Sequence, residues 1–412
     1  MPRHADGPAA LLAPVPKVAL FYLSAEVDDE LRLGELALEP GDAAVALAQL
    51  QLRRRRAHAK PRIARYSASS SGYARFMEDG PTYSDAIDAR ELGVLMEKRD
   101  APAVAHFGLH YGAFAVTAGL AAFHDDVRVR IAAAIVCAPL WAGMFAALHE
   151  TLHLTAFRTR WLNEIAYWLA CFVLFFVPTA ERELHFEHHR HSHEPARDPE
   201  LSVDGENLAR GPRNVFTWLF MNSGLPLIVA RMVMLPSLAM AMPIVLARVE
   251  GAPKLIRMPW IRERHRVRSV VEAWVFLALY GVAAYACARA HAGLAVESFV
   301  ALCAAFFAGQ AMLAIYQECE HRGLEPAGDI FARTRSLQTN AIVRWLAWNM
   351  SWHAEHHAYP AVPFHALREL HGRLLPRLVH HERGIAALTW AAFRRSLQMQ
   401  RRPCGSRSSL SQ

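Results

Sequence analysis

The sequence is poor in cysteine, and its cysteines follow no metal-binding or disulfide pattern. There are 6 in 412 residues, and no two have the C-x-x-C spacing that zinc modules use. These counts exclude a secreted fold built on disulfides and a cysteine-type zinc module. The chain also lacks internal repeats and coiled-coil heptads, and its beginning lacks the pattern of a secretory signal peptide.

Charge is also scarce, and the excess of basic residues has no nucleic-acid context. Charged residues make up 20% of the chain and hydrophobic residues 53%, which excludes disorder of the whole chain. The net charge of +7 is compatible with nucleic acid, an anionic membrane surface or an acidic partner. The basic cluster Arg53–Arg56 has no RNA-binding motif or aromatic residues beside it. We therefore interpret it as solvated or membrane-facing, and we expect no nucleic-acid partner.

Apolar segments long enough to cross a bilayer are few, in keeping with a mean hydropathy of +0.10. A span needs about 20 mostly apolar residues. The predicted spans are Ala103–Phe123, Ile131–Leu148, Val270–Ala288 and Phe299–Tyr316. Two other segments are ambiguous, because Ile165–Val177 is short and Val215–Ala247 is interrupted by prolines. We expect each to form interfacial or re-entrant helices, or a tight hairpin.

The distribution of arginine orients these spans. Only Arg128 and Arg130 lie between the first two spans, and only Arg289 lies between the last two. The remaining segments are rich in arginine, which places both termini and the middle segment in the cytoplasm. We expect an all-α integral membrane protein with about four transmembrane helices, interfacial helices and a cytoplasmic helical cap. Its predicted parts are a cytoplasmic arm of unknown function (1–85), a membrane domain (86–385) and a basic tail (386–412).

Histidine is the abundant residue that decides the interpretation, with 22 in the chain. Three clusters, HETLH, HFEHH and HAEHH, space their histidines three or four residues apart, so each cluster directs its imidazoles from one helix face. In the predicted topology all three lie at the cytoplasmic border of the membrane, where the histidine of QECEHRG joins them. The nine histidines are His149, His153, His185, His188, His189, His321, His353, His356 and His357.

Nine imidazoles are too many for one zinc ion, which takes four ligands. They suit two metal ions with four or five nitrogen donors each. Imidazole binds iron, zinc, copper and nickel. We favour iron because it can activate O2. Open coordination positions on the metal, beside a lipid-facing cleft, would suit that chemistry.

Three alternatives use parts of the same pattern. HETLH alone matches the HExxH signature of zinc proteases. The pairs Glu150-x-x-His153 and Glu318-x-x-His321 resemble those of soluble di-iron bundles. The third alternative is a histidine-rich metal carrier without catalysis. The two HxxHH clusters and the membrane spans argue against all three.

Other histidines have weaker signals. His106 and His110 form an isolated HxxxH in the first predicted span, with no neighbouring signature. His365, His380 and His381 are expected to be surface or packing residues.

The three clusters and their flanks resemble the membrane fatty acid desaturase superfamily, whose histidine boxes read HxxxH, HxxHH and HxxHH in this order. HETLHLTAFRTRWLN is similar to the first-box region of bacterial members, HHRHSHEPARDPEL to the second and NMSWHAEHHAYPAVPFHALRELH to the third. The resemblance covers about residues 90 to 380. Some of the flanking sequence is similar to the bacterial branch that includes the rhizobitoxine-precursor desaturase.

The resemblance implies a non-haem di-iron centre (Fe2+/Fe3+) held by the eight box histidines. His321 matches the extra ligand that follows the last span in acyl-CoA desaturases. Gln317 stands where those enzymes have an asparagine that holds a metal-bound water, so it is a possible water-mediated ligand, although glutamine departs from the pattern. Asp198 and Glu200 are expected to orient histidines through their second ring nitrogen.

The resemblance also implies the reaction and its partners. We expect O2-dependent desaturation of an acyl chain at a site that faces the cytoplasm, in the bacterial inner membrane. A hydroxylase of the same superfamily and a desaturase of a small amphipathic metabolite are the alternatives. The chain has no HPGG motif of a fused cytochrome b5 and no ferredoxin-type cysteine set. Electrons must therefore come from a separate donor, such as a ferredoxin or a cytochrome with its reductase.

Overall fold

The fold is described from a computed structural model over residues 87–201, 211–212, 214–290, 295–326 and 328–400. The predicted arm 1–85, with its basic cluster, and residues 401–412 of the predicted tail lie outside these described residues. The helices are α4 (Ala89–Leu95), α5 (Asp100–Phe123), α6 (Val127–Leu152), α7 (Arg160–Leu174), α8 (Pro178–His191), α10 (Val215–Asn222), α11 (Leu225–Ala239), α12 (Met242–Val245), α13 (Lys254–Arg257), α14 (Glu263–Ala290), α15 (Ala295–His321), α16 (Ile330–Arg333), α17 (Ala341–Leu346), α18 (His353–Ala358), α19 (Leu367–Leu374) and α20 (Ile385–Gln400). Two short 3-10 turns, η1 (Pro199–Leu201) and η2 (Leu375–Arg377), and two strands, β1 (Ser336–Gln338) and β2 (His381–Arg383), complete the described chain.

The long helices agree in large part with the predicted spans. Within the described residues, three helices are long and apolar enough to cross a membrane: α6, α14 and α15. They contain the second, third and fourth predicted spans. The first predicted span falls in α5, a continuous helix of 24 residues that packs along α6 but is not among the three.

The first ambiguous segment falls in α7 and ends at the bend before α8, and the second contains the bent pair α10 and α11. Helices α7 and α8 meet at 96°, and α10 and α11 meet at 53°, so counting each pair as one span gives up to five spans. The first bend follows Phe175, which adopts a left-handed φ of 62°, and α8 then begins with Pro178, a residue suited to the first turn of a helix. The second bend is at Gly224, where φ is 74° and an added Cβ would lie 2.6 Å from the Gln310 carbonyl oxygen. Local backbone chemistry therefore interrupts both segments.

Helix α6 is central, because it packs against α5, α7 and α15. Two glycines permit this close packing. A Cβ on Gly309 of α15 would lie 2.8 Å from the Ala138 carbonyl oxygen of α6, and a Cβ on Gly143 of α6 would lie 2.6 Å from the Leu346 carbonyl oxygen. Small residues allow membrane helices to approach one another in this way.

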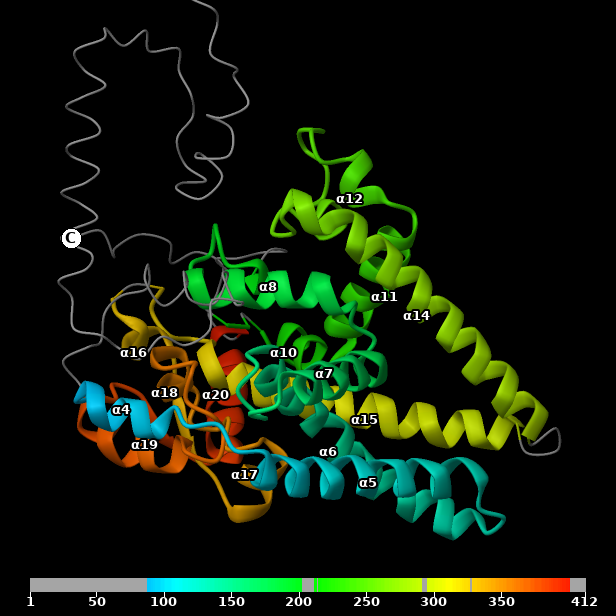
Figure 1. Ribbon diagram of the computed structural model, residues 1–412, viewed down its shortest axis with the longest axis horizontal. Helices are drawn as coiled ribbons and strands as arrows, with labels where there is room; N and C mark the ends of the chain where they lie inside the picture. The colour runs from blue at the N-terminus through cyan, green and yellow to red at the C-terminus, as the bar shows by residue number, and fades with distance from the viewer. Residues whose placement is uncertain (1–86, 202–210, 213, 291–294, 327, 401–412) are drawn as a thin grey trace, which may run out of the picture. The chain divides into compact units, whose positions relative to one another are not determined.

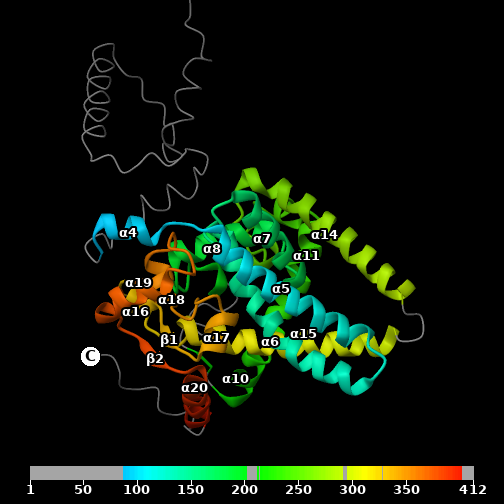
Figure 2. The same ribbon diagram turned by 60° about the horizontal axis from the view of Figure 1, so that its bottom comes forward.

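The elements from α16 to α19 form a cap at one end of α5, α6 and α15 (Figures 1 and 2). The opposite end of the bundle holds the end of α5 and the beginning of α6 (Figure 1). The cap shares one hydrophobic core with α5, α6 and α7, and in this core Trp348, Leu367, Leu370 and Leu374 are fully buried. The strands β1 and β2 pair in parallel, with Ser336 opposite His381, and are a small addition to the predicted all-helical fold.

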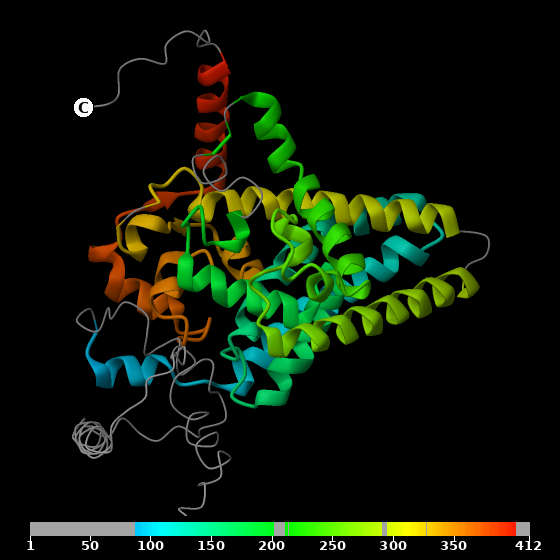
Figure 3. The same ribbon diagram turned by 90° about the horizontal axis from the view of Figure 1, so that it is seen from above.

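Helix α20 stands across α15 and packs against both α15 and α10 (Figure 3). It covers most of the segment predicted as the basic tail, up to Gln400. Trp218 of α10 and Phe393 of α20 meet edge to face, with ring centroids 5.1 Å apart. This contact joins two helices that are far apart in the sequence.

Candidate metal centre

Four helices carry the nine predicted histidines to one place. The end of α6 supplies His149, and His153 follows it as the helix cap. Helix α8 supplies the second cluster, α18 supplies the third, and His321 is the last residue of α15. Because α8 is turned by 96° from α7, its histidine face meets the ends of α6 and α15. The nine side chains divide into two groups.

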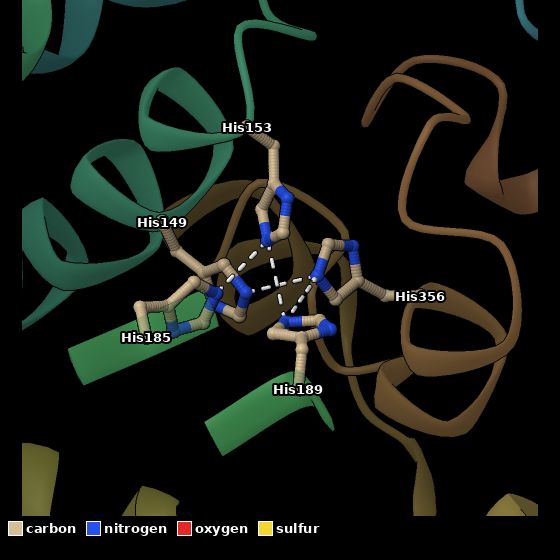
Figure 4. Close-up of side chains that lie close together, drawn as sticks. All are labelled: His149, His153, His185, His189 and His356. Atoms are coloured by element: carbon tan, nitrogen blue, oxygen red, sulfur yellow. Dashed lines mark hydrogen bonds between the residues drawn. The ribbon is translucent and has the colours of Figure 1, made fainter. Parts of the chain in front are cut away.

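The first group holds five buried histidines: His149, His153, His185, His189 and His356. They come from α6, α8 and α18 and point toward one another (Figure 4). The Nε2 atoms of His149 and His356 are 2.9 Å apart, as are those of His153 and His185. The Nε2 atom of His189 lies 3.3 Å from that of His153 and 3.4 Å from that of His356.

The second group holds His188, His321, His353 and His357. The Nε2 atom of His353 lies 2.9 Å from that of His321 and 3.0 Å from that of His357. The two groups adjoin, since the rings of His189 and His357 stack with centroids 4.2 Å apart. In each group, one ring nitrogen per histidine lies within 4.8 Å of all the others.

Partners at the second ring nitrogen hold the rings of the second group. The Nδ1 of His188 lies 3.0 Å from both carboxylate oxygens of Asp198 and 3.6 Å from Glu200 Oε2. The Nδ1 of His321 donates to the Arg333 carbonyl oxygen over 3.0 Å. These contacts leave Nε2 of each ring to face the group, which fixes the tautomer that a metal ligand needs.

Two further orienting partners were not predicted from the sequence. The Ser192 hydroxyl lies 3.0 Å from Nδ1 of His357, and a carboxylate oxygen of Glu320 lies 3.4 Å from Nδ1 of His353. The sequence contains a signal for Ser192. It follows His188 by about one helical turn, which places it on the same side of α8 as that histidine. Glu320 directly precedes His321 on α15, but only the fold brings it to His353 of α18.

Burial keeps the α18 histidines neutral. Burial, followed by the charge of His188, lowers the pKa of His356 to about 3. Burial also lowers the pKa values of His353 and His357 well below the ordinary value, and neighbouring histidines add to the effect. Neutral imidazole is the form that binds a metal ion.

The carboxyl groups beside His188 behave differently from each other. Burial acts to raise the pKa of Asp198, but the charge of His188 and hydrogen bonds from it and from two backbone N–H groups outweigh burial and lower that pKa. Burial raises the pKa of Glu200, against the opposing effect of His188. Asp198 is therefore the ionised partner that accepts a hydrogen bond from His188.

The donor set fits metal ions. Nitrogen lone pairs brought within 3 to 3.5 Å repel one another unless a proton or a cation lies between them, and nearly every ring in both groups has such a neighbour. Five and four imidazoles are suitable donor sets for two transition-metal ions. The buried histidine cluster is thus able to bind metal.

The histidines with weaker sequence signals lie outside both groups. The Nε2 of His106 bonds the Trp345 carbonyl oxygen over 3.0 Å. His110 bonds the Leu140 carbonyl oxygen through Nε2 and accepts from the Trp348 indole through Nδ1, each over 3.0 Å. His106 therefore ties α5 to the cap, and His110 ties α5 to both α6 and the cap. His365, His380 and His381 are also outside the two groups.

The remaining polar residues near the histidines are mostly structural. Glu150 and Glu355 are fully buried; Glu150 accepts from the Phe364 backbone N–H, and Glu355 bonds the Ser336 hydroxyl and His371. Glu187 is partly exposed and pairs with Arg190. Gln317 is half-buried on α15, and among the described residues no hydrogen bond joins its side chain to either group.

The comparison with known families agrees with this geometry. The family model for fatty acid desaturase matches residues 128–388, which is more than half of the chain and includes all nine histidines. No curated protein matches the chain. The superfamily predicted from the three histidine motifs is confirmed: the chain belongs to the fatty acid desaturase family.

Proposed function

We propose that this protein is a membrane-bound, O2-dependent acyl-chain desaturase with two non-haem irons and a separate electron donor. The observation that carries the proposal is the division of nine imidazoles into adjoining groups of five and four in a chain of the desaturase family. Helices α6, α14 and α15, which could span a membrane, support a site at the bilayer border. The arginine distribution supports a cytoplasmic orientation. The resemblance of the flanks of the histidine motifs to bacterial members supports a bacterial inner membrane.

In this proposal the first group would hold one iron and the second group the other. When bound, the irons supply activation of O2 and removal of hydrogen from an unactivated methylene. The protein orients the imidazoles through Asp198, Ser192 and Glu320 and keeps bulk water away by burying all of the histidines except the partly buried His321. Gln317 remains a possible water-mediated ligand.

Apolar side chains beside the first group suit a hydrocarbon substrate. The ring of Phe145 lies 6.2 Å from that of His149, and Phe176 lies 6.4 Å from Phe145. Neither residue is fully buried, so both offer an apolar surface next to the histidines. Holding one C–H bond in a fixed position is the main task of the protein in such a reaction. Hydroxylation, or desaturation of a small amphipathic metabolite, would use the same residues.

The zinc-protease alternative has less support. In that reading His149 and His153 of HETLH would be two of the few protein ligands of one zinc ion. Instead, they share a group with three further histidines. The Glu150 carboxylate is fully buried and bonds the backbone of the cap at Phe364. This supports a structural role for Glu150.

The test is lipid and metabolite profiling of cells that express the chain, its His356→Ala variant and its His380→Ala variant. We expect an acyl species two mass units lighter in cells with the unchanged chain and with His380→Ala, and its absence with His356→Ala. A gain of sixteen mass units would assign hydroxylation instead, and a change confined to a polar metabolite would assign the small-molecule reaction. Full activity of His356→Ala would refute the proposed centre.

A further inference from the structure

An apolar groove lies on the surface where α10, α15, α17 and α20 meet. Its volume is about 790 Å³. Trp218, Ile315, Val343, Trp390 and Phe393 line it, and none of the nine histidines does. This volume lies within the range of sites that bind small organic ligands.

Arginines surround the adjoining pocket, which shares Thr389 with the groove. Arg322, Arg335 and Arg395 line this pocket, and Glu318 is the carboxylate among its lining residues, with Oε1 3.7 Å from Arg322. Arg335 is buried; its Nη1 donates to the Cys319 carbonyl oxygen over 2.7 Å, while its Nε has no partner among the described residues. The pocket thus has an excess of positive charge and an unused buried donor, which favours an anion.

The change from the apolar groove to the arginine pocket runs along the direction of α15. Ile315 in the groove and Arg322 in the arginine pocket are seven residues apart, which is about 10 Å along a helix. Helix α15 could span the membrane and runs toward the cap, so the apolar end is nearer the bilayer and the arginines are nearer its border. A phospholipid has the same order of acyl chain and phosphate.

A donor suitable for the ester region lines the groove. The indole N–H of Trp218 is buried and has no partner among the described residues. Tryptophan commonly occupies the membrane interface, with its ring in apolar surroundings and its N–H bonded to a polar group. The surface beside the groove is apolar, since Phe216 is 74% exposed and Ile342 is 72% exposed. An acidic peptide would leave this surface uncovered, whereas a bilayer would cover it.

We propose that this surface binds one anionic phospholipid, with an acyl chain in the groove and the phosphate among Arg322, Arg335 and Arg395. The ligand comes from the bilayer, and its binding does not depend on the metal centre or on the reaction proposed above.

The first test uses the full-length protein in detergent, titrated with phosphatidylglycerol or with phosphatidylcholine, and native mass spectrometry to count retained lipids. We expect one phosphatidylglycerol per chain to be retained in preference to phosphatidylcholine. Arg395→Gln should weaken this retention about fivefold, as expected for one basic residue at a membrane surface. Arg394→Gln is the matched control, because Arg394 is the exposed neighbour on α20 that does not line the pocket. Equal retention of both lipids, or equal losses in both variants, would overturn the proposal.

A second pair of variants tests the groove itself. Ala386 and Ala387 are both exposed on α20, but only Ala386 lines the groove. Ala386→Trp should fill the groove and lower lipid retention, while Ala387→Trp should not. Soluble glycerol phosphate at the lipid concentration should not displace the lipid. Complete displacement, or no effect of Ala386→Trp, would mean that the acyl chain is not held in this groove.

Discussion

At the scale of single residues, the contact between Asp198 and His188 links the loop after α8 to the second histidine group. Both carboxylate oxygens lie 3.0 Å from Nδ1, and Asp198 also accepts from the backbone N–H groups of His193 and Glu200. One carboxylate therefore holds a ring and the turn that follows it. An ionised acceptor at Nδ1 leaves Nε2 free to bind a metal ion and raises its basicity.

We expect Asp198→Ala to weaken iron binding 10- to 100-fold, the usual cost of losing such a partner, and Asp198→Asn to cost less because the amide oxygen still accepts. Iron retained after dialysis against graded chelator would measure the effect. Glu187→Gln is the control, since Glu187 adjoins His188 in sequence but pairs with Arg190. An Asp198→Ala variant that kept iron like the control would show that the ring is held by other contacts.

At the scale of helices, glycine decides how closely α15 packs on α6. At Gly309 an added Cβ would lie 2.7 Å from the Trp141 ring and 2.8 Å from a backbone oxygen of α6, so the two helices would have to separate. Helix α15 also carries His321 at its end. Separation of the two helices would therefore displace His321 in the metal centre as well as loosen the packing of α15 on α6.

Gly309→Ala should lower the free energy of unfolding by about 1 to 3 kcal/mol, the usual cost of overpacking. Thermal unfolding of the purified protein in detergent would measure this. Gly281→Ala in α14 is the control, because a Cβ there meets nothing within 4 Å. If the two variants unfolded alike, the close contact of α6 and α15 would contribute nothing to stability.

The same elements show how much could be predicted from the sequence. Helical spacing identified which histidines share a face, and hydropathy located α6, α14 and α15. The shortness of one apolar segment and the prolines of the other marked both as ambiguous, but these signals could not give bends of 96° and 53°. Periodicity describes one helix at a time, so it could not divide the nine histidines between two groups. It also could not bring Glu320 to His353 across two helices.

At the scale of the whole molecule, the two groups are connected through shared helices. Helices α8 and α18 each contribute to both groups, whereas α6 contributes only to the first and α15 only to the second. Each group therefore has a histidine that can be removed without touching the other group, such as His153 in the first and His321 in the second.

We expect two irons per chain in the loaded protein and about one in either His153→Ala or His321→Ala, because each variant weakens one donor set and leaves the other complete. The double variant should hold almost none. Elemental analysis of the purified proteins would give these ratios, with His380→Ala as the control. One zinc per chain in the unchanged protein, with no iron, would contradict the two-iron assignment and revive the protease alternative.

The sharing of α18 sets an order of assembly during synthesis. Four of the five histidines in the first group are translated by residue 189, and only His356 follows much later. The second group has only His188 and His321 until α18 emerges with His353 and His357. A nascent chain can therefore nearly complete the first group from α6 and α8, while the second group forms only when α18 folds back onto them. A chain cut off before α18 would therefore keep four of the five histidines of the first group and two of the four of the second.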